Sequence, residues 1–251
     1  MDLQRRVSFI VLLSVAPLAA ICQPHEITVV ENCASSTRCI EKVIPSTVSV
    51  RDAAAPKRAV NELAKGVENG LKNRHDKAER HFRKALEIYP AYDSAIAALA
   101  ESITNQGKWE EAEHIIVSAL ERAPDHPALL RVQAAIHQHA HRYAESVPIL
   151  KRVLALEPHS ESALVLLARA ELLTGDCRNA AVHAREAHLQ QLHFNSITHI
   201  IGATCEERLG NLTEAQRHYE LFLKEEPSGT TADFARISLA RITTRTVAQE
   251  R

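Results

Sequence analysis

Aromatic residues and glycine are both scarce in this chain. Only 4% of its 251 residues are aromatic and seven are glycine, whereas 45% are hydrophobic, so alanine and the aliphatic residues supply most of the apolar content. Sandwiches and barrels of β-strands are rich in aromatic and β-branched residues and in glycine-containing turns. The composition therefore excludes a β-sandwich and favours a helical chain.

A surplus of charge of either sign is also missing. Thirty Lys and Arg residues stand against 31 Asp and Glu residues, which gives a net charge of −1 and a pI near 6.9. Proteins that bind nucleic acid carry a clustered basic face. The sequence shows none, so no nucleic-acid partner is expected.

Sequence signatures of catalysis are absent as well. The chain contains no GxSxG, no HExxH, no phosphate-cradling glycine loop and no CxxC. Cysteine–histidine catalysis through Cys177 or Cys205 would need a histidine close by, and no feature of the sequence positions one. We therefore expect neither an enzyme nor a cofactor.

The longest apolar run lies at the amino terminus. Arg5 and Arg6 precede an apolar segment of about 15 residues, and Ala20 to Cys22 has the small-x-small form of a cleavage site. A membrane-spanning helix needs about 20 apolar residues. Residues 1–22 therefore predict a signal peptide and an exported bacterial protein, periplasmic or secreted, without a membrane span. The alternative is a lipid anchor on Cys22, which would make the chain an outer-membrane lipoprotein.

Residues 23–57 show no helical periodicity. Pro45 and Pro56 interrupt any helix, so this segment is expected to be an extended leader. Cys33 and Cys39 lie six residues apart, and in an exported protein this spacing suggests a disulfide that closes a small loop. Two free thiols are the alternative.

Helical periodicity begins near residue 58 and then repeats. In residues 93–126 a first apolar stripe reaches Ile103, Gly107 provides a turn, a second stripe starts at Trp109, and Pro124 ends it. Closing prolines also stand 34 residues to either side, at Pro90 and Pro158. The equivalent turn residues are Asn73, Gly107, His141, Gly175 and Gly210. Asn and His enter the left-handed region more readily than most non-glycine residues, so a left-handed residue is expected at each turn.

Small residues recur in the first helix of each unit, where they allow the paired helices to approach closely. They are Gly66, Ala100, Ala134, Ala168 and Ala203. This 34-residue period and its residue pattern resemble the tetratricopeptide repeat family. The resemblance covers about two thirds of the chain and is strongest in residues 93–126, where Ala100, Gly107, Trp109 and Pro124 match.

The resemblance implies an all-α fold, a right-handed α-solenoid of about five antiparallel helix pairs over residues 58–229. The expected units are 59–92, 93–126, 127–160, 161–195 and 196–229. Residues 230–251 are expected to form a capping helix and tail, because the last unit of a stacked array leaves an apolar face uncovered. Phe234, Ile237, Leu239 and Ile242 of that helix are expected to face inward.

For function, the resemblance implies binding of a protein or peptide along a concave wall formed mainly by the first helix of each unit. The residues expected on this wall are Glu101, Asn105, Arg131, Gln138, His139, Arg169, Leu173, Thr204 and Arg208. The three arginines would together meet carboxylates, which guanidinium binds in a bidentate manner; scattered solubilising charges are the alternative. Some family members bind a partner's terminal carboxylate through Lys and Asn. Here Ala97, Glu101 and Val132 occupy those places, so that activity is not expected.

Two clusters of reactive side chains have plainer interpretations. His137 and His141 have the four-residue spacing of zinc ligands, and His139 lies between them. No Glu follows in the HExxH manner and the repeat pattern puts His141 in a turn, so we expect no metal. Cys177 and Cys205 lie on neighbouring units, and two buried thiols are favoured over a second disulfide.

The sequence thus favours a protein–protein interaction scaffold of the bacterial cell envelope. The alternative is a structural or assembly subunit, tethered through Cys22, that acts by self-association or with outer-membrane machinery. The oligomeric state and the identity of the partner stay open.

Overall fold

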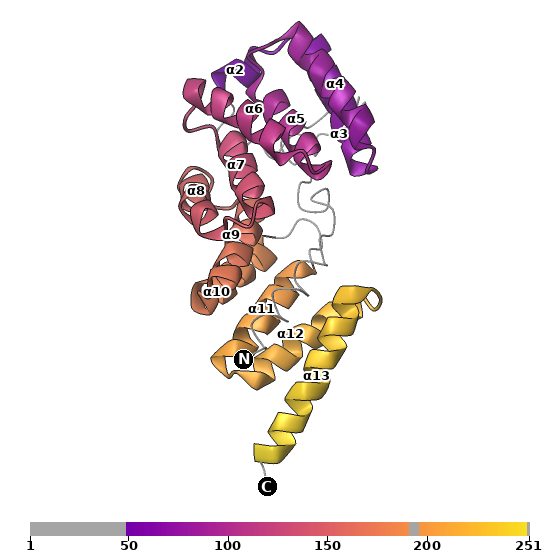
Figure 1. The fold of residues 1–251 in the computed structure, drawn as a ribbon, viewed down its shortest axis with the longest axis vertical. Coiled ribbons are helices and arrows are strands. Elements are labelled where there is room, and N and C mark those ends of the chain that lie inside the picture. The colour runs from indigo at the N-terminus through magenta and orange to yellow at the C-terminus, as the bar shows by residue number, and fades with distance from the viewer. Residues whose placement is uncertain (1–48, 191–195, 250–251) are drawn as a thin grey trace, which may run out of the picture. The chain divides into compact units, whose positions relative to one another are not determined.

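A computed structural model describes residues 49–190 and 196–249, and this part of the chain is entirely helical (Figure 1). It holds twelve helices and no strand. The all-α prediction is confirmed there. The signal peptide, the anchor at Cys22 and the Cys33–Cys39 pair lie outside the described residues. Among the described helices, none combines the length and apolar character needed to cross a membrane.

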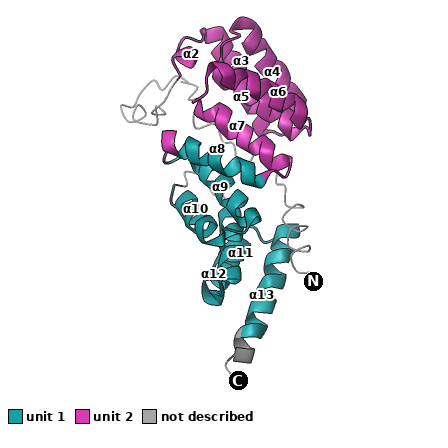
Figure 2. Cartoon of the chain, turned by 60° about the vertical axis from the view of Figure 1, so that its left-hand side comes forward, with its two compact units in different colours: residues 1–16, 143–154, 159–251 teal, residues 17–142, 155–158 magenta. Residues whose placement is uncertain are grey.

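The described chain divides into two compact units (Figure 2). The amino-terminal unit holds the described residues up to 142 together with 155–158, and the carboxyl-terminal unit holds residues 143–154 and those from 159 onward. The first contains α2 (Val50–Ala53), α3 (Lys57–Leu71), α4 (His75–Ile88), α5 (Asp93–Asn105), α6 (Trp109–Arg122) and α7 (Pro127–His139). Most of α8 (Tyr143–Leu156) falls in the second, with α9 (Glu161–Thr174), α10 (Cys177–Leu189), α11 (Ile197–Leu209), α12 (Leu212–Glu225) and α13 (Thr230–Gln249).

Helix α2 departs from the expected extended leader. Residues 50–53 form one helical turn, and the side chain of Ser49 caps it by accepting a hydrogen bond from the Arg51 amide. Local capping and docking against α5, described below, stabilise this turn, although the flanking sequence has no helical period.

The turns between paired helices follow the sequence pattern. Asn73 and His141 have φ values of 54° and 60°, and the three glycines of the set have φ between 80° and 95°. A left-handed residue lets the chain leave one helix and enter the next within a few residues. The prediction of five left-handed turn residues is therefore confirmed.

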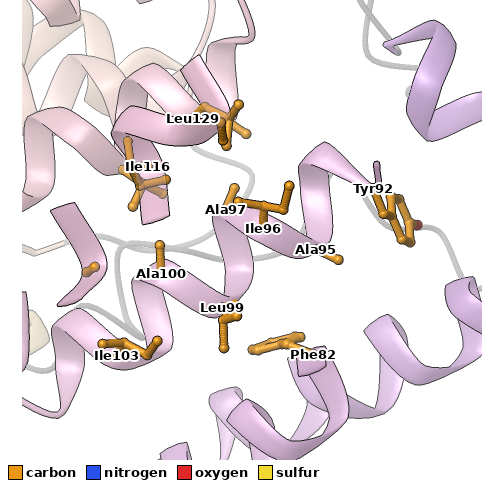
Figure 3. Packing of buried hydrophobic residues seen from close by; sticks show 14 of the residues in the cluster. Phe82, Tyr92, Ala95, Ile96, Ala97, Leu99, Ala100, Ile103, Ile116 and Leu129 are labelled. Carbon is orange, nitrogen blue, oxygen red and sulfur yellow. The ribbon is translucent and has the colours of Figure 1, made fainter. Parts of the chain in front are cut away.

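The core of the amino-terminal unit lies between its paired helices (Figure 3). Leu99 and Ile103 of α5 are buried with Phe82 of α4 and Ile116 of α6. Gly66 of α3 lies against the Phe82 ring: a Cβ added there would stand 2.3 Å from Cε1 of that ring. The small residue predicted for close helix packing thus makes room for an aromatic ring.

In the carboxyl-terminal unit, α13 covers the end of the α11–α12 pair. Phe234 and Ile242 of α13 are buried together with Tyr219 and Phe222 of α12, and the rings of Tyr219 and Phe234 meet edge to face, 6.0 Å between centroids. The helix continues to Gln249, so it takes up nearly all of residues 230–251.

One inward residue of α13 was predicted wrongly. Ile237 is 65% exposed, whereas Ala235 and Ser238 are fully buried. The inner face of the helix runs through residues 234, 238 and 242, at four-residue spacing. Ile237 lies outside that stripe, and the small residues Ala235 and Ser238 share the contact with Phe234 and Ile242.

Candidate functional site

The nine predicted wall residues divide between the two units, so each set is described by itself. Glu101 and Asn105, one helical turn apart on α5, are both half-buried. On α7, Arg131 and His139 are half-buried too, whereas Gln138 is only 2% exposed. The spacing of four and eight residues places each pair on one side of its helix. The amino-terminal unit therefore presents a partly exposed polar strip on two first helices.

Glu101 carries an unsatisfied oxygen in this strip. Its Oε1 atom is buried and has no hydrogen-bond partner within the described chain. Leaving such an acceptor unpaired costs about 1–3 kcal/mol. A donor from a bound molecule would remove that cost, so Glu101 is the wall residue of this unit with the clearest capacity to bind.

In the carboxyl-terminal unit, Arg169 and Leu173 are half-buried on α9. Burial lowers the pKa of Arg169, and Tyr143 of α8 acts in the opposite direction. A partly desolvated guanidinium binds a carboxylate more strongly than one in water does. Arg169 is accordingly the basic wall residue best suited to an acidic group.

The other two wall residues of this unit, Thr204 and Arg208, form hydrogen bonds to backbone carbonyls within the unit. Thr204 is 4% exposed, and its hydroxyl donates to the Ile200 carbonyl at 2.8 Å. Arg208 is exposed, but its Nη1 atom donates to the Leu172 carbonyl at the end of α9, 3.0 Å away. Of the three arginines expected to bind carboxylates together, this unit holds Arg169 and Arg208, and Arg208 donates a hydrogen bond to the Leu172 carbonyl.

The three histidines near residue 139 take different surroundings. His141 occupies a left-handed turn, and the buried His137 has its Nε2 atom 4.0 Å from Glu113 Oε1. Arg142 also contacts Glu113, at 2.6 Å. In residues 49–190 and 196–249, no group of three or more His, Cys, Asp or Glu side chains is arranged so that it could hold a metal ion.

Sequence analysis missed the contacts that dock α2. Asp52 accepts hydrogen bonds from the Ser94 amide at 3.0 Å and the Ser94 hydroxyl at 2.7 Å, and its Oδ2 atom lies 3.1 Å from His126 Nε2. Burial opposes ionisation of Asp52, but hydrogen bonds from His126 and Ser94 hold its pKa below the usual value. Beside it, burial raises the pKa of Asp93. These contacts join residues that lie 42 and 74 positions apart in the sequence, so no local sequence pattern predicts them.

Histidines at one repeat position were also missed. His81, His183 and His218 each lie 22 residues after the start of their expected units. His81 Nδ1 pairs with Glu62 at 2.8 Å, and His183 Nδ1 pairs with the buried Glu171 at 2.6 Å. The Glu171 hydrogen bond raises the pKa of His183. Reading the repeat columns for polar residues would have found this position.

The third of these histidines belongs to a larger cluster. His218 Nδ1 lies 3.2 Å from His199 Nδ1, and His199 Nε2 lies 3.3 Å from Glu225 Oε1. An ionised carboxylate only accepts, so neutral His199 donates from Nε2 and takes the Nδ1 proton of His218 as its partner. Burial, aided by His188 and His218, lowers the pKa of His199 to about 4. The pKa of Glu225 is itself raised by burial and by Glu226.

Comparison with known proteins found a match to a family model and several solved structures with a similar fold. Residues 71–136 match the family model described as tetratricopeptide repeat. The chain is similar to TTC0263, a thermophilic TPR protein of Thermus thermophilus, with 19% identity and a TM-score of 0.60 over 74% of this chain and 99% of that one. No match was found among curated protein sequences.

Two further solved structures are informative. PilF of Pseudomonas aeruginosa is 17% identical, with a TM-score of 0.61 over 78% of this chain and 92% of that one. YrrB, described as a TPR protein with an unusual peptide-binding site, is 15% identical, with a TM-score of 0.52 over 71% and 91% of the two chains.

The fold and these comparisons define a helical-repeat protein with the tetratricopeptide-repeat fold. Such proteins generally mediate protein–protein interactions, and the fold is that of a scaffold. The family resemblance inferred from the residues is thereby supported.

Proposed function

We propose that this chain is a non-enzymatic scaffold of the bacterial cell envelope that binds a peptide or a partner domain through its first helices. The observation that carries the proposal is the polar strip on α5 and α7, with a buried, unsatisfied oxygen on Glu101. A peptide backbone or a basic side chain supplies the donor that this oxygen lacks. Asn105, one turn further along α5, offers both a donor and an acceptor to an extended chain.

The carboxyl-terminal unit contributes a different chemistry. Arg169 favours a carboxylate, and Leu173 on the same side of α9 adds an apolar contact. A partner segment with a hydrogen-bond donor suits Glu101 of the amino-terminal unit, and a segment with an acidic group suits Arg169 of the carboxyl-terminal unit.

Export is the second part of the proposal. It rests on the signal-like residues 1–22, with Arg5 and Arg6 before the apolar run. Mass spectrometry of the mature amino terminus tests it. A start after Ala20 or Cys22 supports a soluble exported protein, whereas a lipid-modified Cys22 supports the tethered alternative, and an intact Met1 refutes export.

A matched set of variants tests binding. Full-length protein is crosslinked in envelope extract, and its partners are identified with four single substitutions compared in parallel. Asn105→Lys and Leu173→Lys change the first helices. Val117→Lys and Val182→Lys introduce the same charge on the second helices, where these valines are 45% and 41% exposed.

We expect the wild-type protein and the two second-helix variants to capture the same partner, and the first-helix variants to lose it. Circular dichroism confirms that all four variants remain helical. Equal capture by all four variants would show that the first-helix strip is not the binding surface.

Light scattering tests the assembly alternative, since a concentration-dependent oligomer lost only in second-helix variants would favour self-association.

A further inference from the structure

Cys177 and Cys205 come from neighbouring helices of two consecutive repeats. Cys177 is the first residue of α10, and Cys205 lies within α11. They are 7% and 0% exposed, and both belong to the apolar cluster formed with Ala168, Leu172 and Ile201. Both thiols are free in the structure.

The two cysteines lie on facing sides of α10 and α11. The Cys177 sulfur is 3.8 Å from Nη1 of Arg208, which stands three residues after Cys205 and so on the same side of α11. No other cysteine occurs in residues 49–190 and 196–249. A disulfide bond has a length of about 2 Å and needs the side chains to point toward one another. Both side chains are buried in one cluster formed by α9, α10 and α11, so each points toward the neighbouring helix, which meets the second condition.

Exposure decides which sulfur of the pair reacts first. Arg208 is held by the Leu172 carbonyl at 3.0 Å, with its Nη1 atom 3.8 Å from the Cys177 sulfur. Burial, together with Cys177, raises the pKa of the Cys205 thiol. Cys177, the more exposed of the two, is therefore the sulfur that reacts first with an external oxidant.

We propose that Cys177 and Cys205 form an intramolecular disulfide that joins the fourth repeat to the fifth. The oxidant is a low-molecular-weight disulfide such as oxidised glutathione. The Cys177 thiolate attacks one sulfur of the oxidant and releases the other as a thiolate, which takes up a proton. The Cys205 thiol then gives up its proton, and its sulfur attacks the Cys177 sulfur of the mixed disulfide; the bond from Cys177 to the oxidant's sulfur breaks, and the departing thiolate takes up a proton to become the second thiol. Two protein S–H bonds become one S–S bond, and the two electrons pass to the oxidant, whose S–S bond becomes two S–H bonds.

The bond would link positions 28 residues apart and hold α10 against α11. A crosslink of this span restricts the unfolded chain. For a unit of this size, we expect oxidation to raise the thermal midpoint by several degrees, on the order of 5–10 °C. The proposal is independent of the binding function, because neither cysteine belongs to the first-helix strip.

Peptide mapping of the full chain tests the proposal. To remove other thiols, Cys22, Cys33 and Cys39 are replaced by Ser, and the native protein is incubated with oxidised glutathione. Free thiols are alkylated after denaturation, and the protein is digested with trypsin without reduction. We expect the peptide 170–178, which contains Cys177, to be joined to the peptide 186–208, which contains Cys205. Reduction should separate them.

Thermal unfolding with and without a reducing agent supplies the second measurement. The reducing agent should lower the midpoint of the protein with Cys177 and Cys205, and should leave Cys177→Ala and Cys205→Ala variants of it unchanged. Two alkylated cysteines after incubation would overturn the proposal. Glutathione retained on Cys177, or bonds only between separate molecules, would overturn it as well, since each shows that Cys205 does not complete the reaction.

Discussion

Replacing Gly66 with alanine is expected to destabilise the amino-terminal unit, although alanine is the better helix former. The added Cβ would lie 2.3 Å from Cε1 and 2.5 Å from Cδ1 of Phe82. Carbon atoms pack at about 3.5–4.0 Å, so the ring or the helix must move by about 1 Å. Phe82 is 4% exposed and has little room to move. Overpacking of this kind costs about 1–3 kcal/mol.

The same helix provides a control. Gly70 also lies in α3, and a Cβ added there meets nothing within 4 Å. Gly70→Ala should therefore stabilise the unit by about 0.5–1 kcal/mol, the usual gain of alanine over glycine within a helix. Both variants gain this term, so the difference between them isolates the overpacking cost of about 1–3 kcal/mol.

Urea unfolding followed by circular dichroism gives the free energies, and fluorescence of Trp109, the single tryptophan, reports on the same unit. A double-mutant cycle with Phe82→Leu adds a direct test, because a smaller side chain opposite position 66 should relieve the clash. We expect a coupling energy of about 1 kcal/mol or more. If Gly66→Ala proved as stable as Gly70→Ala, the contact with Phe82 would not limit residue 66 and the reasoning would fail.

The carboxyl-terminal unit should lose stability in acid through His199. Burial lowers its pKa from 6.5 to about 4, so between these values the unfolded chain binds more protons than the folded one, and the free energy of unfolding falls as the pH falls. The loss is on the order of 2–3 kcal/mol, and His199→Gln should flatten the pH dependence between about pH 7 and about pH 5 in urea unfolding. An unchanged slope in that variant would contradict the assignment. In the same unit, Phe234→Ala should cost about 3 kcal/mol by uncovering Tyr219, while Ile237→Ala should stay within about 0.5 kcal/mol. Equal thermal midpoints for these two variants would show that α13 does not cap the unit as described.

The repeat pattern of the sequence predicted the helices of this protein and the turns between them. Each turn residue named from the sequence, including the unusual Asn73 and His141, adopts the left-handed conformation. Such features depend on the neighbouring residues alone, because a helix period and a residue that tolerates positive φ act within one turn of chain. The small residue at Gly66 likewise marks a close helix approach that the structure contains.

The repeat pattern did not predict the contacts between residues that lie far apart in the sequence. Ile237 is as hydrophobic as the buried Ile242 of the same helix, yet it lies outside the contact with α12, while Ala235 is buried. Arg208 was expected to face a ligand, but its Nη1 atom donates a hydrogen bond to the Leu172 carbonyl, 36 residues away in the chain. Asp52 and His126 meet across 74 residues. The hydrophobic periodicity of a sequence indicates that a helix has an inner face. The orientation of that face, and the partner of each polar side chain, depend on which helices pack together in space.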